Sequence, residues 1–122
     1  LKGGGSGSAI GNWTPAEVST EWKWVAWPVS PDDLKNLRGV RFTYTSGRHA
    51  LEIEQVELVG DGRMIDGRRH AGLAGKPSRE NCYQLSLPEG VHANNGLLIR
   101  AKVRTVGGND SRGKIELLKK NG

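Results

Sequence analysis

The chain has little cysteine, few aromatic residues and no long hydrophobic run, and each shortage excludes a class of protein. Its single cysteine, Cys82, cannot form an internal disulfide or build a thiolate metal site alone. We expect Cys82 to be a small, buried apolar residue in a strand. No apolar run approaches the ~20 residues that a membrane-spanning helix needs, so we expect no membrane partner.

Catalytic signatures are missing as well. The sequence has no nucleophile elbow, no phosphate-binding loop and no pair of histidines at metal-ligand spacing, because His49, His70 and His92 are spread along the chain. Glu52 and Glu54 alternate with apolar residues, which predicts the solvent-facing side of a strand rather than an acid–base pair. We therefore expect no catalytic residue, no metal ligand and no cofactor.

The net charge of +5 permits an anionic partner. The longest basic clusters, Arg68-Arg69 and Lys119-Lys120, are nevertheless short, and the aromatic-plus-basic signature of RNA-binding domains is missing, so we expect no nucleic-acid partner. One alternative stays open. Arg100, Lys102 and Arg104 share one face of a predicted strand and could bind a sulfated glycan with an affinity that falls steeply with salt.

Alternation of apolar and polar residues with a period of two predicts strands along most of the chain, and no stretch shows a long helical period. The clearest strand is 97–106, and others are expected at 22–29, 40–45, 51–58, 63–66, 83–87 and 115–118. About seven or eight short strands separated by glycine-rich turns predict an all-β fold, an antiparallel β-sandwich of the jelly-roll type.

The sequence also indicates boundaries within this fold. Residues 1–9, rich in Gly and Ser, are expected to be a flexible linker or a cloning remnant before a single β-sandwich domain at 10–122. The apolar face of 51–58 changes phase near Glu54-Gln55, so we expect a β-bulge there. A short helical turn is expected after Pro31.

All four tryptophans fall within the first quarter of the chain. An indole either anchors a core or offers a platform on which a sugar ring stacks. Alternation puts Trp22 and Trp24 on one strand face and Trp27 on the other, where we expect it to join the core. Trp13 precedes the first clear strand and is the freest candidate for a platform. The indoles predicted to bind a ligand are therefore Trp13, Trp22 and Trp24.

Two polar, glycine-containing segments are candidate partners for these indoles. The first, 66–80, is a long loop for a compact sandwich; its Arg69 and His70 can donate to sugar hydroxyls, although the loop can equally be structural. The second, a turn, contains Asn109 and Asp110, which can bond the backbone or a ligand. Calcium is not expected there, because a calcium site needs about six to eight oxygens and acidic residues nearby are few.

The order of several motifs resembles a known module. They run from Ile10-Gly11-Asn12-Trp13-Thr14-Pro15 through the tryptophan-rich strand and the segments 42–47, 51–58, 70–75 and 81–85 to 107–113. Over 10–118 the chain is similar to the β-sandwich accessory domains that follow the catalytic domain in bacterial glycoside hydrolases, particularly β-N-acetylhexosaminidases. The resemblance implies a galactose-binding-like jelly roll from an exported enzyme, hence an extracellular or periplasmic location, and it carries no catalytic residue onto this chain.

One position departs from the family pattern. An Asp commonly stands two residues before the histidine of the glycine loop, whereas this chain has Arg68 there and its nearest acid is Asp66. Two hypotheses on function stand side by side: a non-catalytic module that binds glycan, and a structural module without a ligand that stabilises an adjacent catalytic domain.

Overall fold

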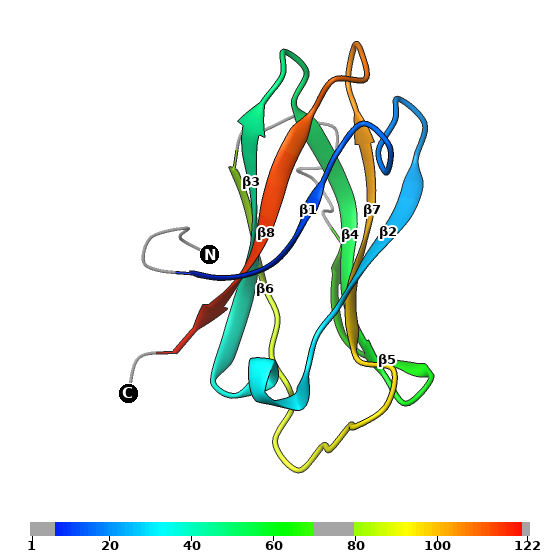
Figure 1. Cartoon of the computed structure of the whole chain (residues 1–122). Helices are drawn as coiled ribbons and strands as arrows, with labels where there is room; N and C mark the ends of the chain where they lie inside the picture. The colour runs from blue at the N-terminus through cyan, green and yellow to red at the C-terminus, as the bar shows by residue number, and fades with distance from the viewer. Residues whose placement is uncertain (1–6, 70–79, 121–122) are drawn as a thin grey trace.

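Among the described residues, 7–69 and 80–120 of a computed structural model, eight strands form two antiparallel sheets of four that pack face to face (Figure 1). The first sheet has the order β1 (Gly7–Trp13), β8 (Arg112–Lys119), β3 (Leu37–Ser46) and β6 (Glu80–Gln84). The second sheet has the order β2 (Lys23–Pro28), β7 (Leu98–Thr105), β4 (Leu51–Gly60) and β5 (Arg63–Arg69). The predicted antiparallel β-sandwich is confirmed.

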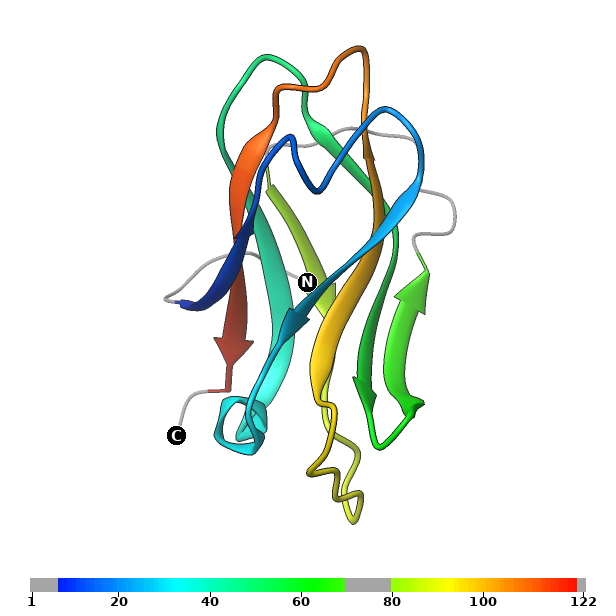
Figure 2. The same ribbon diagram turned by 45° about the vertical axis from the view of Figure 1, so that its right-hand side comes forward.

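The strand pairing is that of a jelly roll. β1 pairs with β8, β2 with β7, β3 with β6 and β4 with β5, so each connection except that between β4 and β5 crosses from one sheet to the other. The β1–β2, β3–β4 and β7–β8 connections meet at one end of the sandwich, which we call the loop end (Figures 1 and 2). The short helix η1 (Pro31–Leu34) and the segment 85–97 lie at the opposite end, the η1 end.

Apolar side chains that alternate inward from both sheets fill the space between them. On β7 the side chains at 99, 101 and 103 are fully buried. Four aromatic rings pack together: the centroid of Phe42 lies 6.3 Å from that of Trp13, 5.7 Å from that of Trp27 and 6.0 Å from that of Tyr83. The prediction that Trp27 belongs to the core is confirmed.

The prediction that Trp13 is the freest indole is wrong. Trp13 ends β1 and is 1% exposed, and its Nε1–H donates to Oγ of the buried Ser111 at 3.0 Å. The small and polar residues before it carry no strand pattern, and it is pairing with β8 that makes them a strand. For the same reason the expected linker at 1–9 is wrong for residues 7–9, which belong to β1.

Two local features confirm the sequence pattern. The pairing of β4 with β7 shifts register between Ile53 and Gln55, which is the predicted bulge. Helix η1 begins at Pro31, and Ser30 caps it, because the Ser30 side chain accepts from the Asp33 N–H while the Asp33 side chain accepts from the Ser30 N–H. No helix in the described residues has the length and apolar character needed to cross a membrane.

Two other expectations need correction. The 66–80 loop does not begin at Asp66, because β5 continues to Arg69 by pairing with β4. His70 and the residues up to 79 lie outside the part of the chain that the structure describes. Cys82 does lie in a strand, β6, but it is half-buried rather than buried, since it pairs with Arg41 on the outer side of the first sheet.

Gly113 of β8 lies against the Trp13 ring with no room for a side chain. An added Cβ would overlap the six-membered ring of Trp13 and the carbonyl oxygen of Thr43. We expect Gly113→Ala to lower the free energy of unfolding by about 1–3 kcal/mol, measured by urea denaturation. Arg112→Ala, at the exposed neighbouring position, is the control and should change it by less than ~0.5 kcal/mol. Equal losses in the two variants would contradict this account.

Candidate functional site

The outer face of the second sheet brings together indoles and charges of both signs. β7 turns three cations outward, because its alternate residues face the core. β4 presents three carboxylates beside them, and β2 with the residue before it presents two indoles. We call this surface the indole face; it consists of Trp22, Trp24, Glu52, Glu54, Glu57, Arg100, Lys102 and Arg104.

Arg104 links a carboxylate on one side to an indole on the other. Its Nε donates to Oε1 of Glu52 at 2.6 Å, and its guanidinium carbon lies 4.5 Å from the ring centroid of Trp22. A guanidinium over an indole is attracted to the ring electrons, and the carboxylate holds that guanidinium in place. The Trp22 ring is therefore oriented by the protein's own contacts.

Arg100 likewise links a carboxylate to an indole, at the next position along the face. Its Nε and Nη2 lie 2.7 and 2.6 Å from Oε1 of Glu57, and its guanidinium carbon lies 5.0 Å from the ring centroid of Trp24. Between the two arginines, Lys102 pairs with Glu54 at 3.6 Å. Each of the three cations therefore has a carboxylate partner.

The indoles differ in how much of the ring is open. Trp24 is 47% exposed, and Trp22 is half-buried. In both, a guanidinium lies over one side of the ring. Trp24 is accordingly the more open of the two indoles.

The prediction that Glu52 faces solvent is wrong. Its side chain does point to the outer side of the sheet, but the residue is 1% exposed, and Oε2 has no hydrogen-bond partner among the described residues. Alternation assigned the correct side of the sheet, yet it does not reveal that Arg104 of the neighbouring strand closes over the carboxylate. Glu54 is the more exposed of the two acids.

Arg69, another predicted site residue, lies on the same side of the sheet as the indoles. Trp24 pairs with Lys102, Lys102 with Gln55, and Gln55 with Arg69, so the four form one row across β2, β7, β4 and β5. Paired residues on neighbouring strands point to the same side, and three strand spacings put Arg69 roughly 14 Å from Trp24. Arg69 thus lies on the same side of the sheet as the indole face, at the far edge strand.

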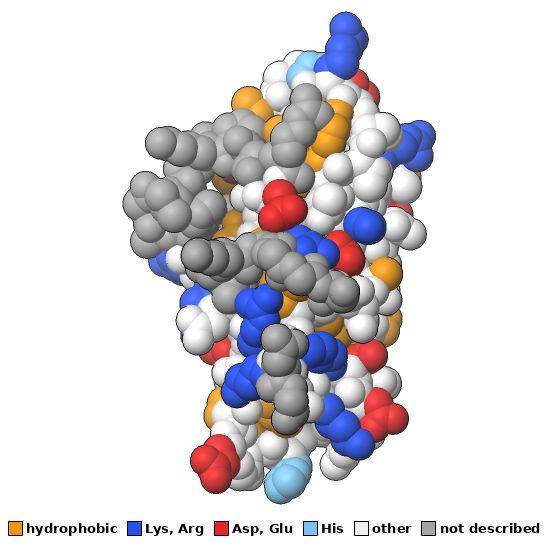
Figure 3. All heavy atoms as spheres, turned by 90° about the vertical axis from the view of Figure 1, so that its left-hand side faces the viewer, with side chains coloured by type: hydrophobic (Ala, Val, Ile, Leu, Met, Phe, Trp, Pro, Cys, Tyr) orange, Lys and Arg blue, Asp and Glu red, His pale blue; other side chains and the backbone are white. Residues whose placement is uncertain are grey.

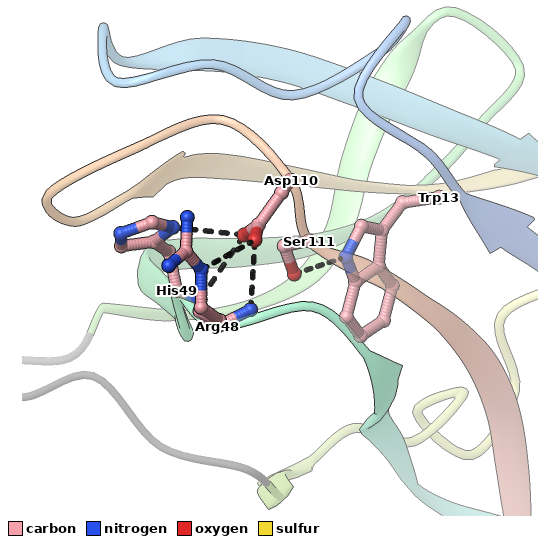
Figure 4. Close-up of polar contacts among 5 residues, drawn as sticks. All are labelled: Trp13, Arg48, His49, Asp110 and Ser111. Carbon is pink, nitrogen blue, oxygen red and sulfur yellow. Dashed lines mark hydrogen bonds and ion pairs between the residues drawn. The ribbon is translucent and has the colours of Figure 1, made fainter.

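Asp110, by contrast, has its oxygens committed to the protein itself (Figure 4). Oδ2 accepts the Arg48 N–H at 2.9 Å, and Oδ1 accepts the His49 N–H at 3.1 Å and lies 2.9 Å from His49 Nδ1. The Arg48 N–H foremost, and then the His49 side chain, hold the pKa of Asp110 below its ordinary value. These bonds tie the β7–β8 connection to the β3–β4 connection, so we call them the Asp110 latch.

Asn109 and Trp13 belong to the same structural set at the loop end. Asn109 Nδ2 donates to the Pro15 carbonyl at 3.5 Å, which links the β7–β8 and β1–β2 connections. Next to it, Ser111 accepts the bond from the buried Trp13 (Figure 4). The structure therefore places Trp22, Trp24 and Arg69 on one face, whereas Trp13 is buried and Asn109 and Asp110 bond other connections at the loop end.

The sequence alone does not indicate that arginines and glutamates pair beside the indoles. From the sequence, Arg100 and Arg104 form a cationic strand face, and Glu57 stands out only as a carboxylate near Glu52 and Glu54. These ion pairs can be recognised only when β4 is known to lie beside β7, because a cross-strand pair depends on both strands. Among residues 7–69 and 80–120, no three His, Cys, Asp or Glu side chains group as metal ligands.

Comparison with known proteins indicates no family, so the functional proposal depends on the geometry of the indole face. The chain matches no protein-family model, and no curated protein sequence matches it.

Removing Arg104 should leave a buried charge without a partner. We expect Arg104→Met to lower the free energy of unfolding by about 2 kcal/mol, less than for a fully buried pair because Arg104 is about one-third exposed. Lys102→Met on the same strand is the matched control and should cost under ~1 kcal/mol, since its partner Glu54 is hydrated. The double variant Arg104→Met/Glu52→Met, which buries no charge, should be more stable than Arg104→Met alone. A double variant no more stable than Arg104→Met would contradict the buried-charge explanation.

The Asp110 latch should make stability depend on pH in the acid range. Because the pKa of Asp110 is lowered in the folded state, its contribution is full above the ordinary value of about 3.8 and is lost as pH falls through the folded value. Asp110→Ala should therefore lower the thermal midpoint at neutral pH, and the gap to the unmodified chain should narrow at about pH 3 and below. Scanning calorimetry of both proteins from neutral to acid pH measures that gap; a gap that stays constant would show that the carboxylate charge is unimportant.

Proposed function

We propose that the chain is a non-catalytic carbohydrate-binding module whose ligand lies on the indole face. The observation that carries the proposal is the exposed Trp24 ring, held next to Trp22 among paired arginines and glutamates. The apolar C–H side of a pyranose ring stacks on an indole, while its hydroxyls need donors and acceptors at the rim. The indole face offers a stacking surface and has hydrogen-bonding groups next to it.

Preorganisation supports this proposal. The guanidinium groups fix one side of each indole before any ligand arrives, so little side-chain freedom remains to be lost on binding. Arg100 is partly exposed and has five N–H donors, of which the contacts with Glu57 occupy two, so others can reach a sugar hydroxyl.

The charge balance favours a neutral glycan over a sulfated one. Arg100, Lys102 and Arg104 are each paired with a carboxylate, so the strip that could attract a polyanion is neutralised within the protein. Affinity should then depend weakly on salt, since no net charge is offered to the ligand. Amide-bearing sugars, such as those in N-acetylhexosamine glycans, fit a surface that supplies stacking and hydrogen bonds without net charge.

The alternative function, a module without a ligand that braces an adjacent catalytic domain, also has one observation in its favour. Met64 on β5 is 55% exposed and lies in the same sheet as Trp24, at its opposite edge. Exposed apolar side chains can mark a surface that another domain covers. Either function agrees with the resemblance to accessory domains of exported glycoside hydrolases, and with it the proposed location is extracellular or periplasmic.

The decisive experiment is an NMR titration, in which N-acetylglucosamine and its short oligomers are added to the 122-residue chain. We expect millimolar or tighter binding with shifts of the indole N–H signals of Trp22 and Trp24. Trp24→Ala should weaken binding about 5- to 150-fold, because losing a stacked aromatic ring costs about 1–3 kcal/mol in comparable contacts. Met64→Ala is the matched control, because it removes an exposed apolar side chain outside the platform.

The outcomes separate the two functions. Binding that survives Trp24→Ala would place the ligand elsewhere, and steep salt dependence would favour the anionic-polymer hypothesis. No shift with any glycan at about 10 mM would reject sugar binding on this face and leave the bracing function as the better account.

A further inference from the structure

A cavity of about 350 Å³ lies at the η1 end of the sandwich, away from the indole face. The η1–β3 turn at 34–37, the segment 87–92 and Lys120 form it, and none of these residues belongs to the indole face. Leu34, Leu37 and Leu87 supply the apolar part of a lining that is about half polar, and the first two are buried members of the core. The volume is at the lower end of the range for ligand pockets and admits about ten non-hydrogen atoms at roughly 30 Å³ each.

The backbone that shapes this cavity is tied by hydrogen bonds. The Lys120 N–H donates to the Asn36 carbonyl at 2.7 Å, which joins the end of β8 to the η1–β3 turn. The Val91 N–H donates to the Pro88 carbonyl at 3.1 Å, which closes the turn on the other side. Lys119 Nζ donates to the carbonyls of Asp33 and Lys35, behind the same wall. These hydrogen bonds fix the backbone around the cavity, as expected for a largely pre-formed pocket.

The charged side chains around the cavity are mostly cationic. Lys35 and Lys120 line it, and Glu89 is the one acid in the lining. Lys35 also pairs with Asp32 at 3.4 Å, but both are highly exposed, so the pair is weak and leaves the lysine available. Lys and Arg side chains also gather over the lower half of the first sheet's outer side, toward the η1 end (Figure 3).

We propose that this cavity binds a small organic carboxylate with an apolar body, held by the leucine wall and oriented by Lys35 and Lys120 at the rim. Apolar walls favour a hydrocarbon body over a polyol, and the excess of cations favours an anionic head group. The site goes beyond the proposed glycan function, because it has its own residues and its own ligand chemistry.

The test is an NMR titration of isotopically labelled 122-residue chain with benzoate, with benzyl alcohol as the uncharged analogue of similar shape and glucuronate as an acid without an apolar body. We expect benzoate to bind with a dissociation constant of about 1–10 mM and to shift the backbone N–H signals of 34–37, 87, 89–92 and Lys120. Benzyl alcohol and glucuronate should each bind at least roughly fivefold more weakly. The indole N–H signals of Trp22 and Trp24 should not move, so this result is independent of glycan binding.

Charge variants test the recognition itself. Lys35→Ser/Lys120→Ser should weaken benzoate binding about fivefold or more, whereas Lys23→Ser on β2, a lysine outside the cavity, should leave it unchanged. Glu89→Gln removes the one acid of the lining and should strengthen binding roughly twofold, an effect that a merely structural role would not produce. Val91→Phe, which fills the cavity, should abolish the shifts while the dispersed spectrum of a folded chain persists.

Three results would overturn the proposal. These are equal affinity for benzoate and benzyl alcohol, benzoate shifts scattered over the surface without a cluster at 34–37 and 87–92, and binding that survives Val91→Phe.

Discussion

The packing of the Trp13 ring against Gly113 is the contact on which the arrangement of this sandwich depends. It joins the edge strand β1 to the central strand β8, and the Phe42 ring on β3 completes the cluster. β1 has few side chains that favour a strand, so the large buried ring with its bond to Ser111 adds to the attachment that pairing with β8 provides. Because β8 also pairs with β3, the ring anchors three of the four strands of the first sheet.

The outer side of the second sheet combines charged and aromatic side chains. On the second sheet, arginine joins each of two carboxylates to an indole, so charge and aromatic surface are organised together. The four tryptophans are thereby divided between two tasks. Trp13 and Trp27 are core residues, and Trp22 and Trp24 form the surface on which the proposed glycan stacks.

The sequence sufficed for the fold class, the bulge and the core position of Trp27, because each depends on periodicity within one segment. It failed where the outcome depends on a partner strand. Trp13 looked free because nothing in its own segment reveals β8, and Glu52 looked exposed because nothing in its own segment reveals Arg104. Trp22 and Trp24 share a face, as alternation predicts, while the arginines that orient them both come from β7, about 80 positions further along the chain.

The bulge in β4 has a consequence for how the chain can vary in length. Glu52 and Glu57 are five residues apart, whereas their partners Arg104 and Arg100 are four apart, and the extra residue at the bulge absorbs the difference. Deleting Glu54, the unpaired residue of the bulge, would make both spacings four and leave Val56 and Leu58 facing the core. One more residue inserted into the ladder after the bulge would instead turn Val56 and Leu58 to solvent and Glu57 to the interior. The pairing with β7 thus lets β4 lose its bulge residue but not gain a further one.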